Sequence, residues 1–343
     1  MLQGVVAGAL LLGLALLLGP RPASLDETPL SPTPCFDRPA QVEAYLARSE
    51  SRFDDVTPGT GKTVIWADPE RRERTPAAVV LLHGFSASRQ EVAPLAERVA
   101  GRLGANLFAT RLTGHGRTPE ALGRATLREW LDDTREALAV GRAIGGRVAV
   151  VGVSHGATLA LWASLGGAAE APDAQVLISP NLGPRDPRAR FLTWPWAGWL
   201  VPRLLGRTHS FEPRNELQER YWTTSYPVEA LFQVAAAEKL VRRRAKGGVE
   251  LAIPTLVLYS PDDQVVDPAR IRAFFEGSGA VLEPVEGAED PSRHLLAGDV
   301  LSPGTTDAMA SRIARFLREA ALSAPGSGDD PAAGPLDSLP SRR

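Results

Sequence analysis

The five residues 152–156, with the sequence Gly-Val-Ser-His-Gly, constrain the fold of this chain more than any other stretch. Residues 147–151 before them are mostly apolar and β-branched, which predicts a buried strand. Residues 157–165 after them are rich in helix-forming side chains. A Gly-x-Ser-x-Gly motif between a strand and a helix places the serine on a sharp turn, where small flanking residues let neighbouring backbone pass close by. The pattern predicts that Ser154 is a nucleophile with an exposed hydroxyl group.

Strand-like and helix-like segments alternate on both sides of this motif, along residues 41–322. Segments that are apolar without internal alternation, as central parallel strands are, lie at 77–82, 105–110, 174–178, 253–259 and 280–285. The segment 126–144 opens on a capping-box pattern and carries an apolar stripe at helical spacing. This alternation predicts an α/β fold with a mostly parallel central sheet flanked by helices. Charged residues at 68–74 predict the tip of a hairpin that joins strands at 63–67 and 77–82.

Residues 181–250 break this alternation. They contain six prolines and four of the seven tryptophans of the chain. Sheet-like segments resume after them, so we interpret this stretch as a helical insertion into the α/β domain and not as a separate domain.

The two ends of the chain differ in composition from this domain. Residues 1–19 form an apolar run without a charged side chain, and its length is close to the shortest that spans a bilayer. Because the run is apolar on every face, it predicts a signal peptide or a single membrane anchor in preference to a buried helix. Proline-rich residues 20–40 predict a linker. Residues 323–343, rich in Pro, Gly, Ser and Asp, predict a disordered tail.

The charge and the cysteine content exclude several classes of function. The 343 residues carry 38 basic and 40 acidic side chains, so no basic field indicates nucleic-acid binding. Cys35 is the only cysteine, which excludes an intrachain disulfide and a cysteine-based zinc cluster.

A serine hydroxyl is a weak nucleophile unless a base takes its proton, and a carboxylate orients that base. In motifs of this kind the three groups follow in the chain order serine, acid, histidine. The histidines stand at positions 83, 115, 155, 209 and 294. Only His294 follows a later strand end with acidic residues, in the loop just after the strand expected at 280–285. We therefore predict His294 as the base for Ser154.

The acid is expected directly after the strand at 253–259, which comes before the strand at 280–285 in the chain. Asp262, Asp263 and Asp267 stand there. Asp267 precedes a proline and fits the N-cap of the next helix. Asp263 is favoured over Asp262, because the two valines that follow it would anchor its loop, whereas Asp262 suits a turn. Asp290, in the loop of the predicted base, is interpreted as loop polarity.

Attack by a serine also needs donors for the oxyanion that forms on the attacked carbonyl. The backbone N–H of His155, directly after the nucleophile, is one candidate. The other is the N–H of Phe85, because Gly84 allows the loop after strand 77–82 to turn. His83 is expected to brace this loop, although His-Gly at a strand end is also an ordinary tight turn.

These motifs together resemble the α/β-hydrolase superfamily, and within it the bacterial branch of carboxylesterases and monoacylglycerol-lipase-like serine hydrolases. The matching stretches, within residues 53–322, are 82–85, 112–120, 152–156, 261–266 and 293–299. The resemblance implies a triad of Ser154, Asp263 and His294, with Phe85 and His155 as the oxyanion donors. The sequence departs from the usual pattern at His155, which replaces a small residue, and in its long, tryptophan-rich insertion.

In this superfamily, residues 181–250 occupy the place of a lid over the active site. The resemblance implies that aromatic side chains of the insertion form an apolar pocket for an acyl chain. The candidates are Phe191, Trp194, Trp196 and Trp199. The alternative is that these side chains only pack the insertion onto the sheet.

The sequence thus predicts a serine hydrolase that cleaves carboxylic esters through an acyl-enzyme, without a metal or an organic cofactor. The expected substrates are monoacylglycerol-like, lysolipid or short-to-medium acyl esters. A thioesterase or amidase with the same residues stays open, as does a membrane-tethered binding protein without turnover. The expected partners are a small ester or lipid and, through residues 1–19, a membrane. The expected localisation is membrane-anchored or exported, in a bacterial cell envelope.

Overall fold

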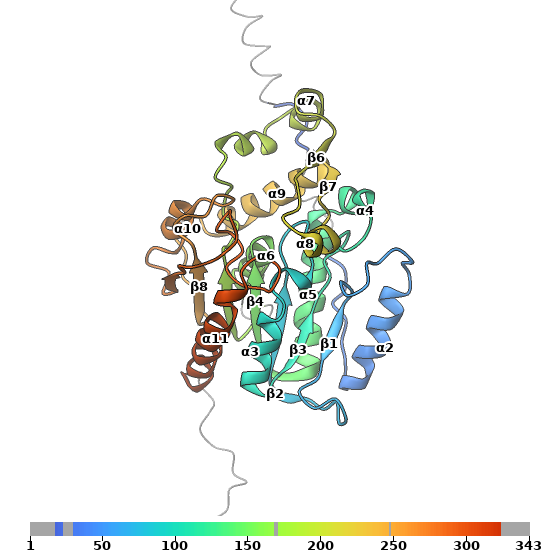
Figure 1. The fold of residues 1–343 in the computed structure, drawn as a ribbon, viewed down its shortest axis with the longest axis vertical. Coiled ribbons are helices and arrows are strands. Elements are labelled where there is room, and N and C mark those ends of the chain that lie inside the picture. The colour runs from blue at the N-terminus through green and yellow to red at the C-terminus, as the bar shows by residue number, and fades with distance from the viewer. Residues whose placement is uncertain (1–17, 23–29, 168–170, 247, 324–343) are drawn as a thin grey trace, which may run out of the picture.

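The structure, a computed structural model, describes residues 18–22, 30–167, 171–246 and 248–323 (Figure 1). Its centre is a seven-stranded sheet with the strand order β1-β3-β2-β4-β5-β8-β9. The strands are β1 (Thr63–Ile65), β2 (Thr75–Leu82), β3 (Asn106–Ala109), β4 (Gly145–Val153), β5 (Ala174–Ile178), β8 (Thr255–Tyr259) and β9 (Val281–Pro284). All neighbouring strands are parallel except β1, which is antiparallel to β3. The predicted α/β fold with a mostly parallel sheet is confirmed.

Helices cover both faces of the sheet (Figure 1). One face packs against α3 (Leu95–Leu103) and α11 (Pro303–Ser323). The other face packs against α2 (Pro39–Glu50), α5 (Leu127–Ile144), α6 (His155–Ser164) and α10 (Pro268–Phe275). The helix α5 begins with the predicted capping box, in which Thr126 and Glu129 exchange hydrogen bonds.

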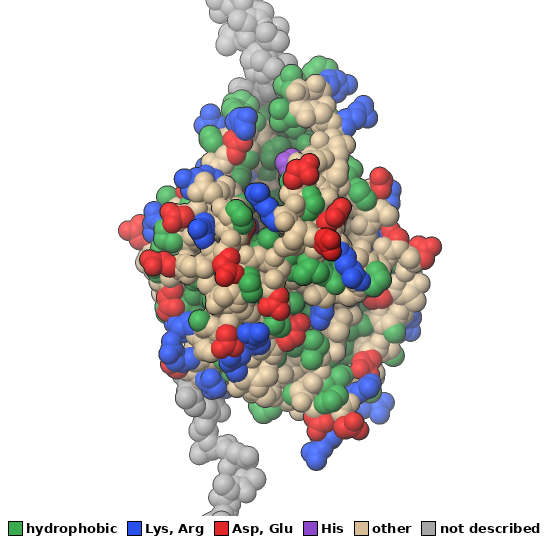
Figure 2. Space-filling model, viewed as in Figure 1, with side chains coloured by type: hydrophobic (Ala, Val, Ile, Leu, Met, Phe, Trp, Pro, Cys, Tyr) green, Lys and Arg blue, Asp and Glu red, His purple; other side chains and the backbone are tan. Residues whose placement is uncertain are grey.

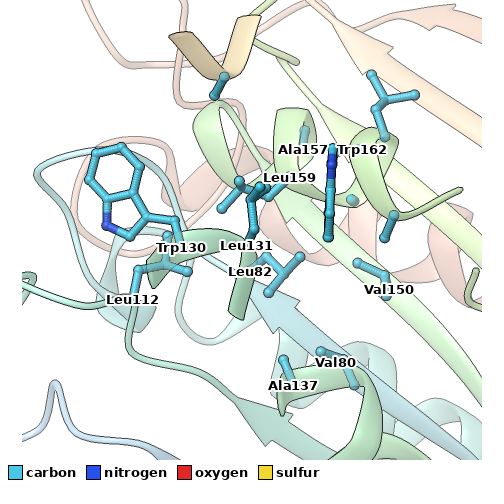
Figure 3. Close-up of a cluster of buried hydrophobic side chains, with 14 of the residues drawn as sticks. Val80, Leu82, Leu112, Trp130, Leu131, Ala137, Val150, Ala157, Leu159 and Trp162 are labelled. Atoms are coloured by element: carbon cyan, nitrogen blue, oxygen red, sulfur yellow. The ribbon is translucent and has the colours of Figure 1, made fainter. Parts of the chain in front are cut away.

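The core follows from the two covered faces. Side chains alternate along β2, so that Val79 and Leu81 join the cluster under α3 and α11, while Val80 and Leu82 join the cluster under α5 and α6. Figure 3 shows Trp130 of α5 and Trp162 of α6 within this second cluster. Because both sides of each central strand are buried, the strands read as continuous apolar runs in the sequence.

The hairpin predicted at residues 68–74 is wrong. The strand β1 pairs with β3 and not with β2. The reason is that both edges of β2 are already occupied, by β3 on one side and by β4 on the other. The charged segment instead crosses over at the end of the sheet to connect strands that are not neighbours.

The insertion at 181–250 lies between β5 and β8, at one end of the sheet (Figure 1). Its elements are η2 (Pro187–Thr193), α7 (Ala197–Leu204), β6 (Thr208–Ser210), α8 (Glu216–Tyr221), β7 (Ser225–Pro227) and α9 (Glu229–Arg244). The strands β6 and β7 pair in a small antiparallel sheet, so the insertion is not purely helical as predicted. Its largest helix, α9, packs against α6, since the ring of Trp162 lies under the guanidinium of Arg244.

The described parts of the predicted linker contact the domain. The backbone and the hydroxyl of Ser31 both donate hydrogen bonds to Asp132 on α5, at 2.9 and 2.7 Å. The segment 18–22 runs beside α7, where the N–H of Trp196 donates to the carbonyl of Pro20 at 2.7 Å. Among the described residues, no helix combines the length and the apolar character needed to cross a bilayer. The apolar residues 1–17 and the tail beyond residue 323 lie outside the described part of the chain.

Candidate active site

Ser154 lies on a sharp turn between β4 and α6. Its backbone has φ 50° and ψ −111°, a left-handed conformation that is strained for a residue with a side chain. The turn is possible because glycines flank it. A Cβ atom on Gly156 would lie 2.1 Å from the carbonyl oxygen of Leu82, and one on Gly152 would lie 2.7 Å from the Cα of Ala157. The serine hydroxyl is therefore held outside the helix that begins behind it.

A continuous chain of hydrogen bonds joins three side chains that are distant in the sequence. The Nε2 atom of His294 lies 2.9 Å from the Oγ atom of Ser154, and Nδ1 lies 2.8 Å from Oδ2 of Asp263. Since an ionised carboxylate only accepts, Nδ1–H donates to Asp263 and Nε2 accepts from the serine hydroxyl. Asp263 is fully buried and His294 is buried, whereas Ser154 is half-buried. This arrangement can remove a proton from the hydroxyl group.

The structure distinguishes between the three aspartates after β8. Asp263 faces His294, and its Oδ1 atom accepts from the N–H groups of Val265 and Val266. Asp262 is exposed and does not reach the histidine. The side chain of Asp267 caps α10 by accepting from the N–H of Ala269, as predicted. The predicted apolar anchoring of this loop holds only in part, because Val266 is buried but Val265 is exposed.

The interpretation of Asp290 as plain loop polarity is wrong. Its buried carboxylate accepts from the backbone N–H groups of His294 and Leu295, both at 3.0 Å. On the other side of the loop, the hydroxyl of Ser179 donates to the carbonyl of His294 at 2.7 Å. These two side chains fix the backbone of His294, so its ring is presented to Ser154 in one position. Of the two, only Asp290, four residues before the histidine, had a signal in the sequence.

The loop after β2 brings a second set of groups to Ser154. His83 is buried and bridges the loop, since it lies 2.9 Å from the carbonyl of Gly84 while its Nε2 accepts from the N–H of Leu112 at 3.1 Å. Burial lowers the pKa of His83 to about 4, so the ring is neutral and carries its proton on Nδ1. The Phe85 ring packs edge-on against Tyr226 of the insertion. A Cβ atom on Gly156 would lie 2.6 Å from the carbonyl oxygen of His83, so this loop passes directly beside the start of α6, where the first N–H groups lack helical acceptors.

A buried acid that the sequence did not single out lies behind this loop. Glu91, at the end of η1 (Arg89–Glu91), accepts a hydrogen bond from the N–H of Gly84. Burial raises the pKa of Glu91 to about 8, so its carboxyl is neutral at neutral pH. No sequence signal marks this residue, because its role depends on the packing of η1 against the loop.

Two further histidines form an aromatic cluster under the site. His155 is buried with its ring 4.7 Å from the ring of Trp130, and His115 lies 5.7 Å from the same ring. Neither ring nitrogen of His155 has a hydrogen-bond partner within the described part of the chain. Burial lowers the pKa of His155 to about 3 and that of His115 well below its usual value. Both rings are therefore neutral packing groups under the site.

A cavity of about 1130 Å³ extends from Ser154 and His294 into the insertion. Its lining is mostly apolar and includes side chains of η2, α7 and α9. Phe191 and Trp194 belong to this lining, as predicted for the pocket, but Trp196 and Trp199 do not. Trp196 instead contacts residues 19 and 20, and Trp199 is exposed with the guanidinium of Arg203 over its ring. Such a cavity accommodates a long apolar group whose reactive end reaches the serine.

Across residues 18–22, 30–167, 171–246 and 248–323, no group of three or more His, Cys, Asp or Glu side chains converges as a metal site.

The fold and the hydrogen-bonded serine at the strand–helix turn define a hydrolase of the α/β-hydrolase class. A family model described as Hydrolase_4, serine aminopeptidase S33, matches residues 73–283. This chain belongs to that family, which confirms the superfamily predicted from the motifs.

Comparison with individual proteins agrees. The chain is 28% identical over 212 residues to the thermostable monoacylglycerol lipase of Bacillus sp. (strain H-257). This alignment covers 62% of this chain and 80% of the lipase. A solved structure from work on LipS and LipT, two metagenome-derived lipolytic enzymes, has a TM-score of 0.62 at 22% identity and covers 77% of this chain and 99% of its own. The monoacylglycerol lipase of Paleococcus ferrophilus has a TM-score of 0.54 at 17% identity, with 75% and 98% covered. These two structures share the fold.

Proposed function

We propose that this hydrolase cleaves carboxylic esters of lipid type through Ser154, His294 and Asp263. The observation that carries the proposal is the hydrogen-bonded chain of these three side chains, of which Ser154 and His294 line an apolar cavity. The named activity of the Bacillus relative, a monoacylglycerol lipase, supports an ester substrate of this kind. The size and apolar lining of the cavity support an acyl chain as the part of the substrate that it holds.

In the proposed mechanism, the Oγ atom of Ser154 attacks the acyl carbon while Nε2 of His294 takes its proton. The carbonyl oxygen becomes an oxyanion that accepts from the N–H groups of Phe85 and His155. Asp263 keeps the proton of His294 on Nδ1 and stabilises the imidazolium. The bond to the alcohol oxygen then breaks, and Nε2 gives its proton to the leaving alcohol.

The acyl-enzyme is resolved by the same groups. A water molecule attacks the acyl carbon, and Nε2 of His294 takes a proton from it. The bond between the acyl carbon and Oγ breaks, Ser154 regains the proton, and the carboxylic acid leaves. Each oxyanion donor is expected to contribute about 3 to 4 kcal/mol of transition-state stabilisation.

In this proposal the insertion 181–250 acts as a lid that supplies the acyl pocket. Phe191, Trp194 and Leu200 would contact the chain of the substrate, because they line the cavity above the serine. The polar side chains of Asn181 and Glu238 also line this cavity. They are suited to hydroxyl groups of an alcohol.

Replacement of the serine tests the proposal. Ser154→Ala is expected to abolish both hydrolysis of p-nitrophenyl esters and labelling by a fluorophosphonate. Ser164→Ala, at the other end of α6, is the matched control, since its hydroxyl donates to the carbonyl of Leu161 and accepts from the Gln175 side chain, and neither group belongs to the site. Retained turnover or labelling in Ser154→Ala would refute the mechanism.

A substrate panel tests the bond that is cleaved. Wild type and Ser154→Ala would be compared on monoacylglycerols of increasing chain length, a lysophospholipid, an acyl-CoA and an aminoacyl arylamide. We expect serine-dependent turnover of the esters to exceed that of the thioester and the amide. Dominant arylamide or acyl-CoA turnover would assign the same residues to an amidase or a thioesterase. Absence of turnover on every compound would favour a binding protein.

We also propose that residues 1–19 direct the enzyme to the membrane or through it, in a bacterial cell envelope. The apolar, uncharged composition of this run supports the proposal. Fractionation of cells that express the full chain, with N-terminal sequencing of the mature protein, distinguishes a retained anchor from a cleaved signal peptide. Recovery of the intact chain in the cytosol would contradict both.

A further inference from the structure

The exposed apolar side chains of the described residues are concentrated in one segment. Eleven large apolar side chains are exposed, and seven of them lie between residues 191 and 205. Leu204 and Leu205 are 76% and 75% exposed, and Trp194 and Trp199 are 56% and 54% exposed. Single exposed apolar residues are common on proteins, but a cluster of this kind marks an interaction surface. We call residues 191–205 the α7 patch. Figure 2 shows green apolar atoms flanked by blue basic ones at this end of the molecule.

The charged side chains in and beside the α7 patch are mainly basic, although Asp186 and Glu212 flank this stretch and Asp186 forms an ion pair with Arg188. Residues 187–211 contain four arginines, at positions 188, 190, 203 and 207, and neither aspartate nor glutamate. The guanidinium of Arg203 lies 4.3 Å from the centre of the Trp199 ring, and that of Arg190 lies 4.9 Å from the Phe191 ring. Tryptophan, leucine and arginine on one surface are typical of segments that lie in the headgroup region of a bilayer.

The N-terminal end of the chain meets the same surface. Besides the bond from Trp196 to Pro20, the guanidinium of Arg21 donates to the carbonyl of Thr193 at 2.9 Å. Residues 1–17, which contain no charged side chain, therefore join the described structure at the α7 patch. Any segment that enters a bilayer from there brings the patch to the bilayer surface.

The cavity of the active site reaches the same place. Phe191, Trp194, Leu200, Leu204 and Leu205 are exposed and also line the cavity. The cavity therefore opens within the patch, and a surface that covers the patch also covers this opening.

From these observations we propose that the α7 patch docks onto the surface of an anionic lipid bilayer. The tryptophan and leucine side chains enter the boundary between headgroups and acyl chains, about 5 to 10 Å deep. The arginines around the patch contact lipid phosphates. Docking itself is independent of the reaction that the serine catalyses. If the proposed ester hydrolysis holds, a lipid substrate reaches Ser154 from the bilayer without passing through water.

Hydrogen exchange on the full chain tests this docking. The protein would be reconstituted into vesicles of phosphatidylcholine alone, or of phosphatidylcholine with phosphatidylglycerol, and exchange measured by mass spectrometry. We expect the peptide 191–205 to exchange at least about tenfold more slowly on anionic than on neutral vesicles, and salt to reduce this protection. The exposed segment 68–74, at the opposite end of the sheet, is the internal reference and should not change.

Two variants make the test specific. Trp199→Glu places a charge in the patch without touching the cavity lining, and is expected to remove most of the protection. Val281→Glu, which is 43% exposed on β9, is the matched control and should keep it. Equal exchange of 191–205 on both kinds of vesicle would overturn the proposal. Protection that depends on protein concentration and not on lipid charge would overturn it too, in favour of a second copy of the chain as the partner. Turnover of a soluble ester, measured in parallel, reports separately on the proposed function.

Discussion

The carboxyl group of Glu91 accepts a hydrogen bond from the backbone N–H of Gly84, and so holds the loop that carries Phe85. Glu91 and Ser154 line the same cavity. Because burial raises the pKa of Glu91 to about 8, the group that positions this loop is uncharged at neutral pH. A neutral acceptor does not oppose an oxyanion forming at the Phe85 N–H, whereas an ionised carboxylate in the same place would repel it.

Glu91→Gln is therefore expected to change the pH profile and not the rate at neutral pH. Glutamine keeps a carbonyl acceptor for the Gly84 N–H but cannot ionise. In the wild type, kcat/KM for a soluble ester should fall as the pH rises through about 8, while the variant should hold its rate to higher pH. Rates measured between about pH 6 and about pH 10 check this. Glu120→Gln, on the exposed surface of α4 (Pro119–Arg124), is the control. An unchanged alkaline limb in Glu91→Gln would show that Glu91 does not act in this way.

Asp290 offers a test of how the His294 loop is held. Asp290→Ala removes the acceptor of the His294 and Leu295 N–H groups, so the ring of His294 is no longer fixed against Ser154. We expect kcat to fall by about 10- to 100-fold, with KM within about threefold, because Asp290 lines the cavity next to His294 and the apolar lining from the insertion is unchanged. Asp290→Asn keeps one acceptor oxygen and should recover part of the rate. Asp262→Asn, an exposed neighbour of the triad acid, should behave as wild type. If Asp290→Ala retains full kcat and rapid fluorophosphonate labelling, the loop holds itself without this carboxylate.

The sequence predicts the site residues that belong to a local motif and not those whose role depends on contact with a distant segment. The nucleophile, the acid and the base follow from local patterns at strand ends and from their order along the chain. The structure brings these residues, Ser154, Asp263 and His294, together. Ser179 and Glu91 have no such pattern, because each acts on a segment that only the folded sheet brings near. The partner of β1 was missed for the same reason, since pairing depends on which edge remains free.

In the insertion 181–250, the sequence predicts the apolar character of the surface but not the direction of each side chain. Aromatic content predicted an apolar surface over the site, and Phe191 and Trp194 do line the cavity. Composition does not state which way each ring points. Trp199 is turned outward on α7, where it belongs to an exposed surface and not to the pocket. The direction of a side chain on a short helix depends on how the helix docks, and this requires tertiary structure.

The buried ring of His155 gives a prediction about stability. In the unfolded chain a histidine titrates near 6.5, whereas burial lowers the pKa of His155 in the folded protein to about 3. Between these values the unfolded state binds a proton that the folded state does not, so stability is lost as the pH falls below 6.5. His155→Met removes this difference and two unpaired nitrogens. It should raise the free energy of unfolding by about 1 kcal/mol at neutral pH and by more near pH 5.

Measurements of activity distinguish the role of the His155 ring from that of its backbone N–H. Since the proposed oxyanion donor is the backbone N–H, His155→Met should keep kcat/KM within about threefold of the wild type. Urea unfolding at two pH values and ester hydrolysis check both parts. His209→Met, at a ring that is only partly buried, should have a smaller effect on the pH dependence of unfolding. The buried rings of His83 and His115 contribute to the acid loss in the same way, so the prediction is that the loss becomes smaller. An acid loss in His155→Met as steep as in the wild type would contradict it.

The contact between α6 and the loop after β2 predicts opposite effects for two glycine-to-alanine changes. A Cβ atom at Gly156 would lie 2.1 Å from the carbonyl oxygen of Leu82 and 2.6 Å from that of His83. Leu82 ends a central strand that cannot move aside, because it pairs with β4 at this position. Gly156→Ala should therefore cost more than about 4 kcal/mol of stability and abolish ester hydrolysis.

Gly101, in α3, has nothing within 4 Å of such an atom. Gly101→Ala should raise the free energy of unfolding by about 0.5 to 1 kcal/mol and leave activity unchanged, because alanine favours the helix. Urea unfolding of the two variants measures the difference directly. A Gly156→Ala protein as stable as the wild type would show that α6 does not pass this close to the loop.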